Sequence, residues 1–435
     1  MNTRKEYGAI DYFRIAAAFM IVAIHTGPLE DISKTADFLV TYCVGRIAVP
    51  FFLMVTGYFI LSDLNGSVRK LAKYLIRFLL MYIGVTLLYL PFTVYAGNLP
   101  HGVGGWLKWF FMDGSFYHLW YLPAALLGCV ITAALLRWCP VWVSGGIVAV
   151  LYAAGLMGDS WYGLVSQVEP LSGIYDALFC FSSYTRNGIF YAPVFLWLGA
   201  VMGGSRKKIE MSEPVKGRRT AVIWGLFAVC LGLMLGEGFF TWSMGLQKHN
   251  SMYLMLIPVS VLLFLGLLRT GGKAPGVLRP VSMWIYLLHP LCIIGVRGVA
   301  KVLHLQKILV DNALVFYVAV CISSFMAAAV IEAGRKFWKR TDAVRRMKSG
   351  NCHNQPTEEG NIEENLSVED MTEEISRDSI IDDITVIDLE EMLDGDPSGD
   401  FEGEDEDVSQ GKSVDRTEGG EPEGECGGIP EDDRA

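Results

Sequence analysis

The stretch that decides the fold is residues 9–26, AIDYFRIAAAFMIVAIHT, an apolar run that carries an arginine and a histidine. Ionisable side chains are costly inside a bilayer, so their presence in such a run indicates a functional site. Arg14 and His25 are eleven residues apart, which on an α-helix places them on one face roughly 16 Å apart. Asp11 lies three residues before Arg14, close enough to pair with it. The run predicts a membrane helix with a polar face.

Nine further apolar runs follow within residues 1–350. They approach the twenty or so residues that a helix needs to cross a bilayer. The sequence therefore predicts an all-α polytopic membrane protein with about ten transmembrane helices. The expected spans are residues 9–26, 39–62, 71–95, 119–137, 141–158, 188–204, 220–236, 251–268, 281–300 and 309–331.

The basic residues in the connections between these spans are unevenly distributed. With the N-terminus in the cytoplasm, the cytoplasmic segments carry 22 Lys and Arg residues and the opposite loops carry six. Connections rich in Lys and Arg stay in the cytoplasm. We therefore expect an even number of spans in the plasma membrane, with both termini cytoplasmic.

The chain has two parts of opposite charge. Residues 1–350 hold 32 basic and 16 acidic residues, whereas residues 351–435 hold 30 acidic and four basic residues. We predict a transmembrane domain at 1–350 and an acidic cytoplasmic tail at 351–435, mostly disordered because it contains too few apolar residues to fold. Within the tail, residues 380–393 (IIDDITVIDLEEML) are expected to fold on a cytoplasmic protein partner. A purely solubilising tail is the alternative.

The second span contains residues 46–60, RIAVPFFLMVTGYFI, in which a proline, a threonine and a glycine interrupt an aromatic run. Such breaks persist in a membrane where neighbours or water satisfy the freed backbone groups. One interpretation is a kink at which Gly57 permits close helix contact. The other is a segment that lines a substrate site.

Two later segments place histidines beside aromatic residues: HLWYLP at 118–123 and SMWIYLLHP at 282–290. Taken alone, the first is typical of an interfacial aromatic belt, and the second of a histidine that binds a neighbouring helix. Glu237, at the end of the seventh span, is interpreted as solvated rather than catalytic, as are Asp176 and Glu169 in the loop 159–187. The cysteines and histidines have no metal-ligand spacing, and we expect neither a metal nor a nucleic-acid partner.

Together, these motifs resemble the membrane acyltransferases of the acyltransferase 3 family, over about residues 8–335. The resemblance lies in the Arg14-x10-His25 element and in the 46–60, 118–122 and 286–290 segments, which recur in order. It is greatest to the membrane half of the membrane-bound serine racemases of vancomycin-resistance operons, where a pyridoxal-phosphate racemase domain follows. Here an acidic tail of 85 residues follows, too short for such a domain, and neither racemase activity nor pyridoxal phosphate is expected.

The resemblance implies transfer of an acyl group, commonly acetyl, from acyl-CoA to a hydroxyl or amine of a sugar or cell-envelope acceptor. Acyl-CoA would be the donor substrate, and no bound cofactor is implied. His25 matches the essential histidine and is expected to act as general base. Arg14 matches the position that contacts the donor, since a guanidinium binds phosphate or carbonyl oxygen well. Asp11 is expected to complete the catalytic set by orienting Arg14.

Other residues of these motifs are expected to have supporting roles. Arg46 would assist Arg14 with the donor or contact the acceptor. The residues expected to bind the acceptor or stabilise an oxyanion are His118, Trp120, Tyr286 and His289. Two other functions stay open: transport of an amino acid such as serine, and a membrane scaffold that works with a separate racemase in cell-wall precursor synthesis.

Overall fold

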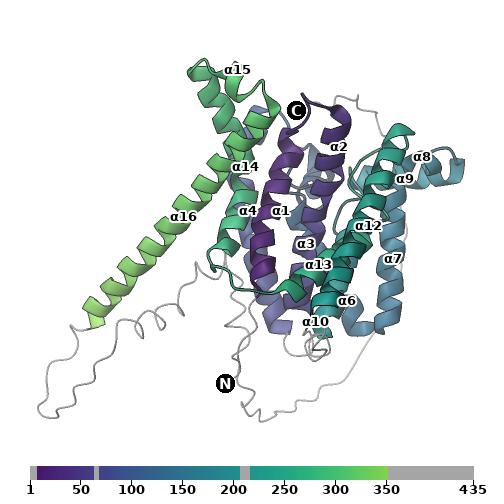
Figure 1. Ribbon diagram of the computed structural model, residues 1–435, viewed down its shortest axis with the longest axis horizontal. Coiled ribbons are helices and arrows are strands. Elements are labelled where there is room, and N and C mark those ends of the chain that lie inside the picture. The colour runs from purple at the N-terminus through teal and green to yellow at the C-terminus, as the bar shows by residue number, and fades with distance from the viewer. Residues whose placement is uncertain (1–6, 63–67, 206–215, 351–435) are drawn as a thin grey trace, which may run out of the picture. The chain divides into compact units, whose positions relative to one another are not determined.

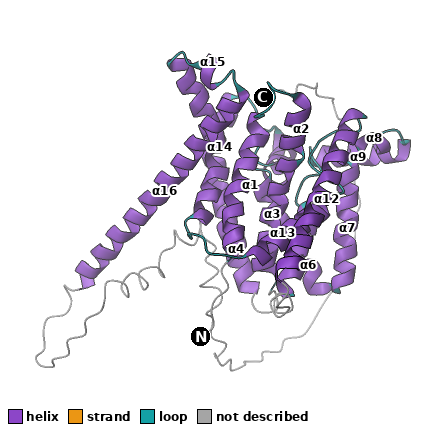
Figure 2. Cartoon of the chain, in the orientation of Figure 1, coloured by secondary structure: helices purple, strands orange, loops and turns teal. Residues whose placement is uncertain are grey.

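The computed structural model describes residues 7–62, 68–205 and 216–350, and every regular element in those ranges is a helix (Figure 2). Seven helical segments there are long and apolar enough to cross a membrane: Gly8–Thr26 (α1), Lys34–Leu61, Val68–Tyr95 (α4), Tyr121–Trp138 (α6), Gly217–Ser243 within α12 (Lys216–Ser243), Leu278–Val302 (α14) and Ala313–Thr341 within α16 (Ala313–Gly350). Three shorter apolar helices are Val141–Met157 (α7), Ala192–Gly204 (α10) and Leu256–Thr270 (α13).

The all-helical class expected from the sequence is confirmed, and the protein is a helical membrane protein. Each of the ten expected spans lies largely on one of the seven long segments or the three shorter helices. The number of spans and the side on which the termini lie stay predictions. The expected tail at 351–435, including the 380–393 segment, lies outside the described residues.

The helices on the periphery leave apolar side chains uncovered. On α12, Val222, Leu226, Val229 and Leu233 recur every three or four residues and are each about half exposed. A stripe of this kind is unfavourable in water and favourable against lipid tails. The long helix α16 has a similar surface, with Ile322 and Val330 exposed, and extends past its neighbours in Figure 1. These two helices therefore present lipid-facing surfaces.

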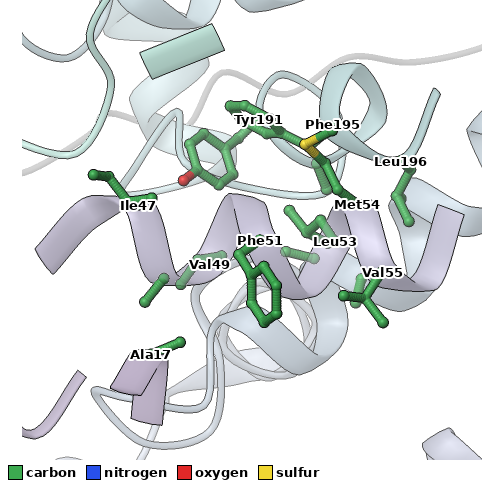
Figure 3. Packing of buried hydrophobic residues seen from close by; sticks show 14 of the residues in the cluster. Ala17, Ile47, Val49, Phe51, Leu53, Met54, Val55, Tyr191, Phe195 and Leu196 are labelled. Carbon is green, nitrogen blue, oxygen red and sulfur yellow. The ribbon is translucent and has the colours of Figure 1, made fainter. Parts of the chain in front are cut away.

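The segment Lys34–Leu61 forms the centre of the packed core. It consists of α2 (Lys34–Tyr42), a 3₁₀ turn η1 (Val44–Ile47), α3 (Ala48–Thr56) and a π-helical turn η2 (Gly57–Leu61). Figure 3 shows side chains on both sides of α3: Met54 lies toward Phe195 of α10, and Phe51 points away from it. All three side chains are almost completely buried. The apolar surface of α3 is thus covered by protein rather than by lipid.

Glycines bring α3 and η2 very close to α10. A Cβ atom added at Gly57 would lie less than 3.0 Å from the backbone of Leu196, and one added at Gly199 would lie less than 3.0 Å from the backbone of Met54. Small residues allow helix backbones to approach in this way in membranes. The interpretation of Gly57 as a close-contact residue is therefore confirmed.

Helices α1 and α14 lie side by side and run in the same direction (Figure 1). Near their N-termini, Asp11 of α1 binds Arg279 of α14. About three to four turns further along, the ring of His25 stacks on that of His289. We call the end of the pair at Asp11 the charged end and the end at His25 the histidine end.

The loop expected at 159–187 contains two helices, α8 (Tyr162–Val165) and α9 (Glu169–Phe181). The start of α9 has recognisable signals, because Pro170 occupies its first turn together with the acidic Glu169, which interacts favourably with the helix dipole. Two short helical segments, α5 (Gly102–Leu107) and η3 (Lys108–Asp113), likewise precede α6, and α15 (Gln306–Leu309) precedes α16.

Candidate active site

Three histidines from distant parts of the chain meet at the histidine end. The ring of His25 stacks on that of His289, with centroids 5.2 Å apart and an angle of 24° between the planes. His118, which precedes α6, points its ring edge-on to His289 at 5.1 Å. The structure thus brings together three of the residues selected from the sequence. We call them the histidine cluster.

Several ring nitrogens of the histidine cluster have no protein partner. His289 uses Nδ1 to hydrogen bond the carbonyl of Tyr286 at 2.8 Å, and its buried Nε2 has no partner. Both ring nitrogens of His118 are buried without a partner. Burial, and then the neighbouring His289 and His25, lower the pKa of His118 well below its usual range. His118 is therefore a neutral imidazole, which keeps one donor and one acceptor for a ligand.

Helix α4 holds the segment that carries His118. The hydroxyl of Tyr82 accepts a hydrogen bond from the backbone N–H of Ser115 at 3.1 Å, and Thr86 bonds the Ser115 hydroxyl at 2.6 Å. From α14, the hydroxyl of Tyr286 donates to the carbonyl of His118 at 2.7 Å. Tyr286 therefore positions the backbone of His118, and its hydroxyl hydrogen is already used.

The charged end contains one carboxylate and two arginines. Asp11 is buried and accepts hydrogen bonds from Nε of Arg279 at 3.1 Å to each of its oxygens. Arg14 Nε lies 3.4 Å from the same carboxylate, so the ion pair expected between Asp11 and Arg14 is present. Nε of Arg14 is nevertheless buried without a hydrogen bond of good geometry. One negative charge thus faces two positive charges, and the end keeps a positive charge for a ligand.

Asp11 is far from the histidine cluster. Fourteen residues of α-helix separate it from His25, a distance of roughly 21 Å along the axis. It contacts the guanidinium groups of Arg14 and Arg279 instead. In chemical terms Asp11 is a positioning residue for these arginines.

Arg46 is at the histidine end rather than beside Arg14. Its turn η1 packs on α1, where a Cβ at Gly45 would lie 3.0 Å from the Ile24 side chain. Its Nε donates to the carbonyl of Asn250 at 2.8 Å, and its Nη2 donates to Oδ1 of the same residue at 2.7 Å. The structure does not bring the two expected donor-binding arginines together.

Trp120, at the histidine end, packs against the loop that precedes α10. Its ring packs edge-on to Tyr191 with centroids 5.8 Å apart, and the guanidinium of Arg186 lies 5.2 Å from its ring centroid. Trp120 therefore joins the segment that carries His118 to the loop before α10.

Glu237 is not a solvated acid, and that interpretation was wrong. Its Oε1 accepts hydrogen bonds from the indole of Trp161 at 2.9 Å and the backbone N–H of Leu254 at 2.7 Å. Its Oε2 accepts the backbone N–H of Met255 at 3.0 Å. The carboxylate therefore ties α12 to Trp161 and to the segment before α13.

Several site residues were missed by sequence reasoning, above all Arg279. The sequence did contain a signal for it: Arg279-x9-His289 on α14 has nearly the spacing of Arg14-x10-His25 on α1. Asn250 and Arg186 gave no such signal, because both lie in loops and their side chains hydrogen bond to residues far away in the sequence. Tyr117, whose ring packs edge-on to His25 at 4.8 Å, was hidden among aromatic residues.

The fold and the site define a polytopic helical membrane protein whose parallel helix pair joins an arginine end to buried histidines. The acyltransferase 3 family model, described as an acyltransferase domain, matches residues 7–333. The chain belongs to this family, and the resemblance inferred from its motifs is confirmed.

Named relatives are racemases of enterococci. The chain is 38% identical to an amino-acid racemase of Enterococcus faecalis over 336 residues, which are 77% of this chain and 46% of that protein. It is 34% identical to a serine/alanine racemase of Enterococcus gallinarum over 352 residues, 78% of this chain and 48% of the relative. The chain thus spans about half the length of the curated relatives it matches. No solved structure matches it.

Proposed function

We propose that the protein transfers an acyl group, acetyl in the first instance, from acyl-CoA to a hydroxyl or amine of a cell-envelope or sugar acceptor. The observation that carries this proposal is the histidine cluster, in which buried ring nitrogens have no protein partner. Leaving polar atoms unsatisfied is costly unless a ligand uses them. The acyltransferase family of the domain gives that ligand its chemical class.

In the proposed reaction His25 is the general base. Its neutral imidazole takes the proton of the acceptor hydroxyl or amine as the oxygen or nitrogen attacks the thioester carbon. The new ester or amide bond forms as the carbon–sulfur bond breaks, and the proton passes from the imidazole to the departing thiolate. A ring N–H of His118 is available to stabilise the negative charge on the carbonyl oxygen in between. His289 already donates its Nδ1 hydrogen to Tyr286, so its Nε2 is an acceptor for a ligand hydrogen.

The charged end supports binding of the donor. Phosphate groups suit guanidinium donors, and Arg14 and Arg279 share one carboxylate between them. The pantetheine arm of the donor would then have to span roughly 16 Å from Arg14 to His25, three helical turns, to place the thioester at His25. This arm is extended and thin, as such a span between helices requires. Asp11 keeps both arginines oriented, and Trp120 supplies an aromatic surface for the acceptor.

The proposed orientation follows from the distribution of basic residues. With both termini in the cytoplasm, the charged end faces the cytoplasm, where acyl-CoA is made, and the histidine end faces the outside of the plasma membrane. An acceptor of the cell envelope would meet His25 from that side.

The test is acyl transfer from radiolabelled acetyl-CoA by the purified full-length protein in lipid nanodiscs, with cell-envelope extracts as acceptors. We expect His25→Ala to lower transfer by about 10²–10⁴-fold, the usual contribution of a general base. His101→Ala is the matched control, because His101 is exposed and precedes α5. Elution as a single species shows that each variant is folded. Undiminished transfer by His25→Ala would refute the catalytic assignment.

A second candidate function is transport of an amino acid, or a scaffold for a separate racemase. The printed names of the relatives, amino-acid racemase and serine/alanine racemase, support it. Uptake of labelled serine into vesicles without any acyl donor would favour transport. Loss of function on deleting 380–393, with His25→Ala tolerated, would favour a scaffold.

A further inference from the structure

Two arginines at the histidine end are held by neutral groups. Arg46 donates to Asn250, and Nη1 of Arg186 donates to the hydroxyl of Ser251 at 2.8 Å. Asn250 and Ser251 are consecutive, so the two guanidinium groups flank a single dipeptide. Among the residues that the structure describes, no ion pair joins either arginine to a carboxylate. Two positive charges therefore lie close together without direct compensation.

The acids at this end bind backbone and loop groups rather than the two arginines. Oδ1 of Asp159 accepts the N–H groups of Ser251 at 2.6 Å and Met252 at 2.9 Å, and its Oδ2 is buried without a hydrogen-bond partner. Glu237 binds two further amides and an indole. Asp113 accepts the N–H of Ser183 at 2.8 Å and its hydroxyl at 2.7 Å. These carboxylates fix loops, and none makes an ion pair with Arg46 or Arg186.

Electrostatics at this end favour a bound anion. Burial, followed by the charge of Arg46, lowers the pKa of Arg186 to about 10, which leaves it protonated at neutral pH. Burial raises the pKa of Asp159, the carboxylate that is electrostatically coupled to both arginines. A ligand carboxylate would relieve the repulsion between the two guanidinium groups, and a neutral ligand would not.

The geometry of Arg186 leaves donors available. Its guanidinium stacks on Tyr184, 4.1 Å from the ring centroid, and lies 5.2 Å from that of Trp120. Stacking fixes the plane of the group, and its Nε is buried without a hydrogen-bond partner. A planar guanidinium with free N–H groups matches a carboxylate in a bidentate arrangement.

These arginines lie next to the histidine cluster. Both are within electrostatic reach of His25. The turn that carries Arg46 packs on α1 one residue before His25, at Ile24, and Trp120 is two residues from His118. A small ligand held by the arginines would present its other groups to the cluster.

We propose that Arg46 and Arg186 form a carboxylate-binding subsite that selects an anionic acceptor and directs its hydroxyl or amine toward His25. The direction toward His25 rests on the proposed acyl transfer, whereas the binding of the anion does not. The acceptor class is thus a small molecule, or the terminal unit of a larger one, that bears a carboxylate next to a nucleophilic hydroxyl or amine.

The experiment measures binding by the full-length protein in nanodiscs with two matched pairs of probes. Serine is compared with serinol, in which a hydroxymethyl group replaces the carboxylate, and glucuronate is compared with glucose. We expect the wild type to bind at least one carboxylate probe at least tenfold more tightly than its partner without the carboxylate. Preference for serine identifies an amino-acid acceptor, and preference for glucuronate identifies a sugar acid.

The variants Arg46→Gln and Arg186→Gln should each remove this preference, and Arg186→Lys should restore it only in part because the bidentate geometry is lost. Arg297→Gln is the matched control: Arg297 lies on α14 and stacks on Phe316 instead. If Arg46→Gln fails to fold, the Arg186 variants decide. Equal binding of the probes with and without a carboxylate by the wild type, or full preference in Arg186→Gln, would overturn the subsite.

The same preparations separate this proposal from the acyltransferase assignment. His25→Ala should bind the carboxylate probe as the wild type does, because the arginines are untouched. In the transfer assay, Arg186→Gln should raise KM for the carboxylate acceptor and leave kcat nearly unchanged. Carboxylate binding without any acyl transfer would remove the proposed function and keep the subsite. Equally efficient transfer to acceptors with and without a carboxylate would remove the subsite and keep the proposed function.

Discussion

At the scale of single residues, Asp11 shows how one carboxylate can organise a buried site. It contacts Arg14 on its own helix and Arg279 on α14, and its side chain is 5% exposed. Removing one partner from a buried ionic group is strongly destabilising, since the remaining charge is left uncompensated. Here the loss of Asp11 would leave two such charges, so its effect should exceed that of losing either arginine.

We predict that Asp11→Asn lowers the free energy of unfolding by about 3 kcal/mol. The double variant Asp11→Asn with Arg279→Gln should be more stable than the sum of the single effects suggests, because one orphaned charge is gone. Denaturant titration of the purified protein checks this. Asp176→Asn is the control, with a change within about 0.5 kcal/mol, because Asp176 is exposed on α9. Additive effects of the two substitutions would contradict the shared-carboxylate account.

At the scale of elements, the contact between the α3–η2 segment and α10 depends on the absence of side chains. Gly57 and Gly199 face each other's helices so closely that a methyl group at either meets backbone atoms. Backbone cannot swing away as the end of a flexible side chain can, so the helices themselves must separate. The η1 turn, which carries Arg46, immediately precedes α3, and a shift of α3 would move that residue too.

Gly57→Ala is therefore expected to destabilise the protein by about 1–3 kcal/mol, the usual cost of overpacking. Gly84→Ala on α4 is the matched control, because a Cβ there has open space around it. In that position alanine should be neutral or slightly stabilising through its higher helix propensity. Thermal unfolding followed by circular dichroism distinguishes the two variants. Equal melting temperatures would show that α10 yields to the methyl group.

At the scale of the whole molecule, the role of each end of the α1–α14 pair depends on the side of the membrane that it faces. The basic connections predict that the charged end is cytoplasmic. In the structure α1 and α14 run in the same direction, so that the arginines near their N-termini contact the same carboxylate and their histidines stack on each other. A donor and an acceptor could then reach the histidine cluster from opposite sides.

Fusions to alkaline phosphatase, which is active only outside the cytoplasm, should report this orientation. We expect a fusion after Gly97, which follows α4, to be active, and one after Ser205, which follows α10, to be inactive. Comparable expression of both fusions, measured on immunoblots, is the control. The opposite pattern of activities would reverse the proposed sides of the donor and the acceptor.

Sequence alone determined the features that depend on local spacing and apolar length. Ten apolar runs indicated helices because burying a helix in lipid needs a run of fixed length, and the Asp11–Arg14 pair followed from a three-residue helical spacing. The tertiary structure decided which of these helices meet. His25, His118 and His289 come from three segments far apart in the chain, and Arg279 reaches Asp11 across 268 residues. Helical periodicity gives the face that a residue occupies but carries no information on the partner helix. Only the packing of α1, α14 and the segment before α6 therefore creates the site.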